Sequence, residues 1–269
     1  MSSLATIVWV HAHPDDEAFF GAGAAAHYSA LGHRTVLVTC TDGALGFDGA
    51  GRAGSEPGHD PRATRATRAG ELQRAAAILG FSRVVTLGYA DSGMAGWPEN
   101  ESPTAFVNAD VDAVARQLAA LFDEEGATVV VTYDENGFYG HPDHVTANVV
   151  TRRAILSAAT VERLYYPVVP EGVLATFVDG AQRLGLSLPA WVSEASTLVP
   201  DDVVTTTLDA RGYVSEKHAA IAAHASQIDN DDLVAMNRDL FEILFGTEYY
   251  QRAWARREVR GDETDLLGV

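Results

Sequence analysis

Short runs of β-branched residues alternate with longer Ala- and Leu-rich segments of helical periodicity along the first 150 residues. This alternation is typical of a parallel sheet whose two faces are both covered by helices. We therefore predict an α/β fold with a mostly parallel sheet. The expected strands are residues 6–10, 35–39, 84–87 and 129–132, and the expected helices are residues 17–31, 61–79, 105–125 and 142–157.

The second part of the chain is less regular. Because no low-complexity linker divides the sequence, a single domain over residues 1–269 is the simplest interpretation. Residues 1–160 form its predicted core, and residues 161–269 form a predicted α/β extension that caps the strand ends and the site. The charged tail, residues 256–269, is expected to fray. Two strands and two helices are expected in the extension, at residues 165–169, 203–208, 212–225 and 233–244.

The charge balance excludes some classes of partner. The chain has 19 basic and 37 acidic residues, a formal net charge of −18, which disfavours binding to nucleic acid. No apolar run reaches the roughly 18 to 20 residues of a membrane span. The single cysteine, Cys40, fits a reducing compartment. We expect a cytoplasmic protein with a small-molecule substrate and no membrane partner, and the sequence leaves a homo-oligomer open.

Two clusters of imidazoles and carboxylates follow strands one and four, at residues 11–17 and 139–144. Ligands of open parallel sheets bind at the carboxyl ends of the strands, so both clusters are candidate site segments. His13 and Asp16 are three residues apart across a turn, and His144 completes a set of two imidazoles and one carboxylate. Such a set is typical of catalytic zinc, and Fe²⁺ also accepts it.

The neighbouring residues suggest proton-transfer chemistry. Asp15 is adjacent to the predicted ligands but directed differently, so it is free to accept a proton from an activated water. His141 is expected to donate to or polarise the reacting group, and Asp143 to hold the ring of His141 in the right tautomer. Glu17 is expected to stabilise a helix N-terminus, and His11 to be a core or supporting residue.

The paired motifs, HPDDE at residues 13–17 and HPDH at 141–144, resemble the signature of the LmbE-like, or PIG-L, metal-dependent deacetylases. Residues 11–17, 91–94 and 133–144 are most similar to the mycothiol branch of that family. This branch holds the N-acetylglucosaminyl-inositol deacetylase and the mycothiol S-conjugate amidase. The resemblance covers roughly the first 160 residues and continues weakly at 223–227.

This resemblance implies a Rossmann-like fold and a zinc-dependent hydrolase that removes an N-acetyl or other N-acyl group from a glucosaminyl small molecule. It implies zinc on the three ligands already named and Asp15 as general base. It further implies that His141 and Tyr139 stabilise the oxyanion or protonate the leaving amine. Arg68 and Asp91 match positions that grip sugar hydroxyls in relatives.

The sequence departs from the mycothiol enzymes at two places. Ala90 stands where close relatives often carry Arg before Asp-Ser-Gly. Ala18, Phe19 and Phe20 make the start of the first helix more apolar than is expected for that branch. Either change would alter the acyl group or aglycone that fits.

Other functions compete with deacetylation. The same metal chemistry serves a mycothiol S-conjugate amidase, a peptidase or an esterase, and a non-catalytic metal-binding relative is a further alternative. Residues 21–26, GAGAAA, match a dinucleotide-binding pattern. These glycines fall inside the expected helix, whereas the dinucleotide fingerprint requires them in the turn before it.

Overall fold

The sheet of this computed structural model is mixed, with the strand order β3-β2-β1-β4-β5-β8-β7 and β6 paired to β5. The structure describes residues 4–188, 192, 197–259 and 261–268. The strands of the parallel part are β1 (Thr6–His11), β2 (Arg34–Thr41), β3 (Arg83–Tyr89), β4 (Ala127–Val131) and β5 (Arg163–Pro170). The remaining strands are β6 (Leu198–Val199), β7 (Thr206–Asp209) and β8 (Thr247–Ala255).

The first five strands confirm the prediction of a Rossmann-like, mostly parallel sheet. Every residue of β1 is buried, as the apolar run predicts for a central parallel strand. The antiparallel part comes from β8, which runs against both β5 and β7. The sequence analysis missed β8, because its mixture of aromatic and charged residues does not form a continuous apolar run.

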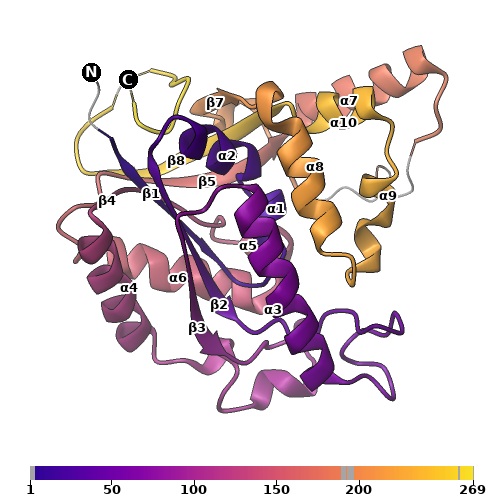
Figure 1. The fold of residues 1–269 in the computed structure, drawn as a ribbon. Helices are drawn as coiled ribbons and strands as arrows, with labels where there is room; N and C mark the ends of the chain where they lie inside the picture. Colours follow the sequence, from indigo (N-terminus) through magenta and orange to yellow (C-terminus); the bar gives the residue numbers. More distant parts are fainter. Residues whose placement is uncertain (1–3, 189–191, 193–196, 260, 269) are drawn as a thin grey trace.

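Helices cover both faces of this sheet (Figure 1). The helices on one face share a core with Val8 and Val10 of β1, and those on the other face share a core with Ile7 and Trp9. The first group is α4 (Val111–Glu125) and α6 (Pro142–Ile155). The second group is α2 (Ala22–Ala30), α3 (Pro61–Ile78) and α8 (Val214–Ala223).

One expected helix, residues 17–31, is two helices in the structure. The short α1 (Asp16–Phe19) ends before Gly21, whose φ of 95° is left-handed, and α2 begins after it. A Cβ at Gly21 would lie 2.6 Å from the indole nitrogen of Trp9. Gly21 is therefore required by backbone conformation and by close packing.

The C-terminal part forms a group of helices beside the sheet (Figure 1). Besides α8, this group contains α7 (Glu171–Leu184), α9 (Asp231–Val234) and α10 (Arg238–Phe245). The expectation that residues 256–269 fray is wrong for the described part of this tail. Leu266 is fully buried, and its N–H donates to the hydroxyl of Tyr28 at 2.7 Å.

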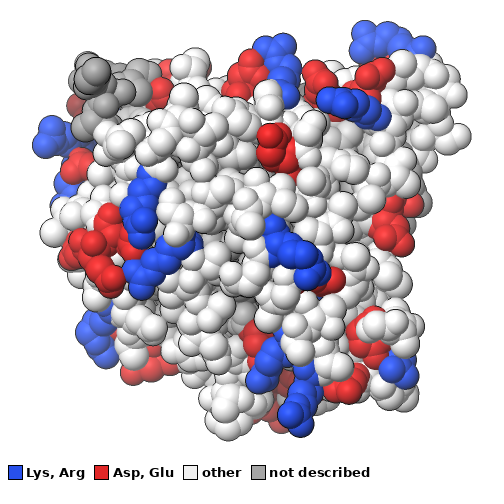
Figure 2. Space-filling model, in the orientation of Figure 1, with Lys and Arg blue, Asp and Glu red and all other residues white. Residues whose placement is uncertain are grey.

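Basic and acidic side chains are interspersed on the face shown in Figure 2. Among the described residues, no helix is long and apolar enough to span a bilayer. The cytoplasmic location stays a prediction, and a homo-oligomer stays open.

Candidate metal centre and active site

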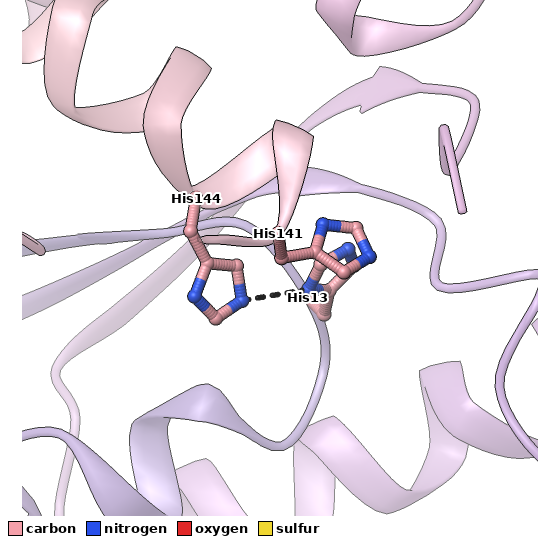
Figure 3. Close-up of side chains that lie close together, drawn as sticks. All are labelled: His13, His141 and His144. Atoms are coloured by element: carbon pink, nitrogen blue, oxygen red, sulfur yellow. Dashed lines mark hydrogen bonds between the residues drawn. The ribbon is translucent and has the colours of Figure 1, made fainter. Parts of the chain in front are cut away.

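The two predicted motifs meet at the carboxyl edge of the parallel sheet. The turn after β1 carries His13 and Asp16, and the first turn of α6 carries His144. His13 and His144 are 131 residues apart in the sequence, yet Nδ1 of His13 lies 3.2 Å from Nε2 of His144. Figure 3 shows these rings facing each other, with His141 beside them. The fold therefore brings the three predicted ligands together.

The spacing of these donors suits a metal ion. Asp16 lies 3.5 Å from Nδ1 of His13 through Oδ2 and 3.4 Å from Nε2 of His144 through Oδ1. Three tetrahedral ligands, each about 2.0 to 2.1 Å from a zinc ion, stand about 3.4 Å from one another. The imidazoles of His13 and His144 and the two oxygens of Asp16 are thus spaced much like the ligands of a small divalent cation.

A third imidazole lies close to the same point. His13, His141 and His144 each offer a nitrogen within 4.8 Å of the others, and all three are buried. A second group has one donor atom from each residue within 4.8 Å of the others, and its members are His13, Asp91, His141 and Asp143. The cluster is consequently rich in donors, and His141 is a second candidate, beside Asp16, for the third ligand.

Negative charge surrounds His13. Burial opposes a charge on this ring, but the carboxylates of Asp91, Asp143 and Asp16 outweigh burial and raise the pKa of His13. Burial lowers the pKa of His144 to about 3, so this imidazole is neutral at pH 7. Buried carboxylates gathered around imidazoles stabilise a cation at their centre.

Tyr133, which the sequence analysis did not single out, supports two of these ligands. Its hydroxyl donates to Oδ2 of Asp16 at 2.6 Å and accepts the N–H of Ala12 at 2.7 Å. Its ring stacks on His144 with centroids 4.0 Å apart. The sequence could have indicated Tyr133 as a site residue, because it follows β4 at the carboxyl edge of the sheet.

The role expected for Asp143 is corrected by the structure. Its Oδ2 lies 3.2 Å from Nε2 of His13 and accepts the N–H of Ser92 at 2.9 Å. The ring of His141 is instead oriented by the backbone, because the N–H of Asp143 donates to its Nδ1 at 3.1 Å. Asp143 therefore orients His13, as carboxylates commonly do for metal-binding imidazoles.

His141 is a neutral hydrogen-bond donor in this geometry. Burial, with the nearby charge of His13, lowers the pKa of His141 to about 4. Since Nδ1 accepts a backbone N–H, the proton of the neutral ring is on Nε2. His141 also lines a cavity that His13, Asp15 and Asp16 share, and we call it the active-site cavity.

Asp15 lies next to the candidate ligands in a strained conformation, with a φ of 123°. Its N–H donates to Oε2 of Glu17 at 3.0 Å, and its Oδ2 accepts from Nη2 of Arg68 at 2.8 Å. Burial raises the pKa of Asp15 to about 7, against the opposing charge of Arg68. Strain of this kind costs about 1 to 3 kcal/mol and persists where the surroundings enforce it.

Arg68 is buried, and its donors are directed to the loops around Asp15. Nη1 donates to the carbonyl of Gly43 at 2.7 Å, and Nη2 donates to the carbonyl of Pro14 at 2.5 Å as well as to Asp15. This geometry makes Arg68 a positioning residue for Asp15. Its contact with sugar hydroxyls stays a prediction.

Asp91 and Tyr139 both line the active-site cavity, which has a volume of about 390 Å³. Asp91 accepts the N–H of Leu45 at 3.1 Å and the N–H of Gly93 at 2.9 Å, so it holds two loops together. Tyr139 is 49% exposed, and its ring lies 4.9 Å from that of His144. Their predicted roles toward substrate stay predictions.

The C-terminal part contributes residues to the wall of this cavity. Gln227, Asp229 and Asn230 line it. Gln227 donates to the carbonyl of Phe47 at 3.2 Å and accepts the N–H of the same residue. The loop of residues 42–60 is thereby tied to the segment after α8.

The N-terminus of α2, where a dinucleotide would place its phosphates, already binds a carboxylate of the protein. The carboxylate of Glu248 accepts the N–H groups of Gly23 and Ala24 in the first turn of α2, at 2.8 and 2.9 Å. Lys217 and the hydroxyl of Tyr250 also donate to this carboxylate. A protein carboxylate thus takes the place of a phosphate, which argues against dinucleotide binding.

Comparison with known proteins identifies the family of this chain. Residues 8–155 match the PIG-L family, described as GlcNAc-PI de-N-acetylase. The chain therefore belongs to the PIG-L family, and the predicted resemblance is confirmed. One relative, the 1D-myo-inositol 2-acetamido-2-deoxy-alpha-D-glucopyranoside deacetylase of Acidothermus cellulolyticus, is 37% identical over 97% of this chain and 94% of its own length.

Two solved structures share the fold. The 4-carboxy-2-hydroxymuconate hydratase GalB of Pseudomonas putida KT2440 has a TM-score of 0.61 at 18% identity, over 96% of this chain and 99% of its own. The N,N'-diacetylchitobiose deacetylase of Pyrococcus horikoshii has a TM-score of 0.57 at 17% identity, over 92% and 82%. Their different reactions show that this fold alone does not fix the chemistry.

Proposed function

We propose that this protein is a zinc-dependent hydrolase that removes an N-acyl group, in the simplest case acetyl, from a glucosaminyl small molecule. The observation that carries the proposal is the convergence of His13, Asp16 and His144, with the carboxylate of Asp15 beside them. Family membership and curated relatives of deacetylase name support the reaction type. Fe²⁺ suits the same donors.

His13, Asp16 and His144 would hold the ion. When bound, zinc supplies Lewis acidity that polarises an amide carbonyl and lowers the pKa of water towards about 7.

The chain's own residues then move the protons and stabilise charge. Asp15 accepts a proton from the attacking water and returns it to the departing amine. His141, whose Nε2 carries the proton, donates to the carbonyl oxygen as negative charge develops there. Tyr139 is the second candidate donor. The products are a free amine on the sugar and a carboxylate.

The cavity walls support an amino-sugar as substrate. The carboxylates and amides of Asp91, Gln227, Asp229 and Asn230 line one cavity with the candidate ligands. Side chains of this kind bind hydroxyl groups through several directed hydrogen bonds, and Trp97 in the same wall offers an aromatic face.

The direct test is hydrolysis of a panel of N-acyl glucosaminides by zinc-loaded and iron-loaded protein, with amine and carboxylate measured separately. The panel includes an inositol glucosaminide and a cysteinyl glucosaminide S-conjugate, because the amidase of the mycothiol branch would cleave the latter amide. We expect equimolar amine and acetate from the N-acetyl compounds. Release only from the S-conjugate would favour the amidase alternative, and no release from any amide would contradict the proposal.

A variant pair tests the general base. Asp15→Asn is expected to lower kcat by about 10² to 10⁴-fold while zinc content is retained. Asp112→Asn, an exposed aspartate on α4, is the matched control and is expected to behave as wild type. Normal turnover by Asp15→Asn would remove Asp15 from the mechanism.

A further inference from the structure

A second cavity lies directly behind the active-site cavity and is almost entirely apolar. Its volume is about 170 Å³, close to the engineered cavity of about 150 Å³ that binds benzene in another protein. Phe19, Phe20 and Phe138 line both cavities and form the wall between them. The walls beyond them come from β5, α7, α8, α10 and β8. We call this second cavity the rear chamber.

The two charged residues of the rear chamber are neutralised by their own contacts. Lys217 donates to Glu248 and to the carbonyl of Phe19, both at 3.0 Å, and lies 4.7 Å above the ring of Phe245. Glu248 is further satisfied at the start of α2. The chamber therefore presents no free charge, and its chemistry favours a hydrocarbon group.

The rear chamber lies next to one candidate ligand, and the polar wall of the active-site cavity lies next to another. This polar wall is formed by Asp91, Gln227, Asp229 and Asn230. The ring centroid of Phe20 is 6.1 Å from that of His144 and 4.9 Å from that of Phe138. On the other side, Asp91 lies 3.7 Å from Nε2 of His13. An amide held between these ligands has two substituents that diverge, so a sugar on the polar wall directs the acyl group towards Phe20 and the chamber.

One residue of the wall between the cavities, Phe138, has a strained backbone. Phe138 has a left-handed φ of 64° in the short α5 (Gly137–Gly140), between two glycines that also have positive φ. A non-glycine residue in this region costs about 1 to 3 kcal/mol. Phe138 is thus the wall residue whose backbone is strained, and passage of a chain between the two cavities would require the wall to move.

We propose that the rear chamber binds the alkyl chain of the substrate's N-acyl group, and that the preferred acyl group is of medium length, about six carbons. This inference rests on the proposed amide hydrolysis and specifies its substrate. Water adds to the amide carbonyl, the C–N bond breaks, and the products are the amino-sugar and a medium-chain carboxylate. The sugar and its aglycone stay on the polar side.

Kinetics on a chain-length series test this proposal. The substrates are glucosaminides of one aglycone that carry N-acetyl, N-butanoyl, N-hexanoyl or N-octanoyl groups. We expect kcat/KM to rise roughly ten-fold or more from acetyl to hexanoyl. A preference for acetyl throughout the series would overturn the proposal.

A matched pair of substitutions locates the effect. Val173→Phe fills the chamber from α7 and is expected to lower the hexanoyl-to-acetyl ratio of kcat/KM at least ten-fold. Val149→Phe makes the same change on the exposed surface of α6 and is expected to keep the wild-type ratio. Equal ratios in both variants would overturn the proposal. A second outcome would also overturn it. If Val173→Phe lowers kcat/KM only for N-acetyl substrates with long alkyl aglycones, the aglycone and not the acyl group occupies the chamber.

Calorimetry with the free carboxylates separates this proposal from the proposed function. Hexanoate is expected to bind the zinc-loaded protein at least ten-fold more tightly than acetate, and Val173→Phe to remove that difference. If no amide is hydrolysed but this difference is found, the chamber assignment stands and the reaction is wrong. If hexanoate and acetate bind alike, the chamber assignment is wrong whatever the activity.

Discussion

His224 and Glu17 are 207 residues apart in the sequence, and Nε2 of His224 lies 2.5 Å from Oε1 of Glu17 inside the protein. Burial opposes a charge on His224, but the Glu17 carboxylate outweighs burial and raises the pKa of this ring. The other oxygen of Glu17 accepts the N–H of Asp15. A residue of the C-terminal part thus fixes the backbone of the proposed base through one intermediate carboxylate.

Glu17→Gln tests this positioning role. The amide keeps the size of the side chain but removes the charge that His224 pairs with, so Asp15 loses its fixed conformation. We expect kcat to fall about ten-fold or more, with KM and zinc content close to wild type. Glu124→Gln, an exposed glutamate on α4, is the control. An equal fall in the control, or a change in KM alone, would contradict the assignment.

Metal analysis distinguishes the two candidate third ligands. Asp16→Asn is expected to lose zinc, because it removes a charged donor from the set. His141→Gln is expected to retain zinc and to lower kcat about 10² to 10³-fold, the usual cost of one oxyanion donor. Elemental analysis of both purified variants gives the answer, and the reverse pattern would identify three imidazoles as the ligand set.

Arg68→Met separates positioning from sugar binding. Because Arg68 contacts Asp15, Pro14 and Gly43, we expect a large fall in kcat with little change in KM. A rise in KM at constant kcat would instead assign Arg68 to the sugar. Steady-state kinetics on one substrate decide between these results.

The buried pair of Glu248 and Lys217 gives a pH-dependent stability. Burial opposes the charge on Glu248, but Lys217 and the hydroxyl of Tyr250 lower its pKa below the ordinary 4.5. The stabilisation is therefore complete above pH 4.5 and is lost as the pH falls through the lower pKa of the folded state.

Glu248→Gln is expected to cost about 3 to 5 kcal/mol at pH 7, because Lys217 loses its buried counter-charge. Urea unfolding of wild type and variant at several pH values measures this difference. We expect the gap to narrow below pH 4.5, since the wild type then loses the same interaction. A gap that is constant down to pH 3 would contradict the linkage.

The tail provides a further test of packing. Leu266 is fully buried, so Leu266→Ala is expected to destabilise the protein by about 2 to 5 kcal/mol. Leu156→Ala, at a leucine that is 70% exposed, is expected to change stability by less than about 0.5 kcal/mol. Equal unfolding midpoints for the two variants would mean that the tail does not pack in solution.

The sequence was most informative where its signals are local. Apolar runs predict β1 and its parallel neighbours because a strand buried on both faces has no polar alternation. The motif after β1 places His13 and Asp16 within one turn, so their proximity follows from chain geometry. Long-range partners carry no such signal. The pairing of Glu17 with His224 and the contact of Asp143 with His13 depend on packing across the whole fold.

The carboxylate of Glu248, which accepts two N–H groups at the start of α2, limits how far the chain can be truncated. A fragment that ends at residue 160 would keep every candidate zinc donor, but it would lack Glu248 and His224. The N–H groups of Gly23 and Ala24 in α2 would then lose their acceptor, and the buried carboxylate of Glu17 would lose its contact with His224. Residues 1–160 are therefore not expected to be active when expressed alone. A shortened relative or a fusion protein would need other residues in place of Glu248 and His224.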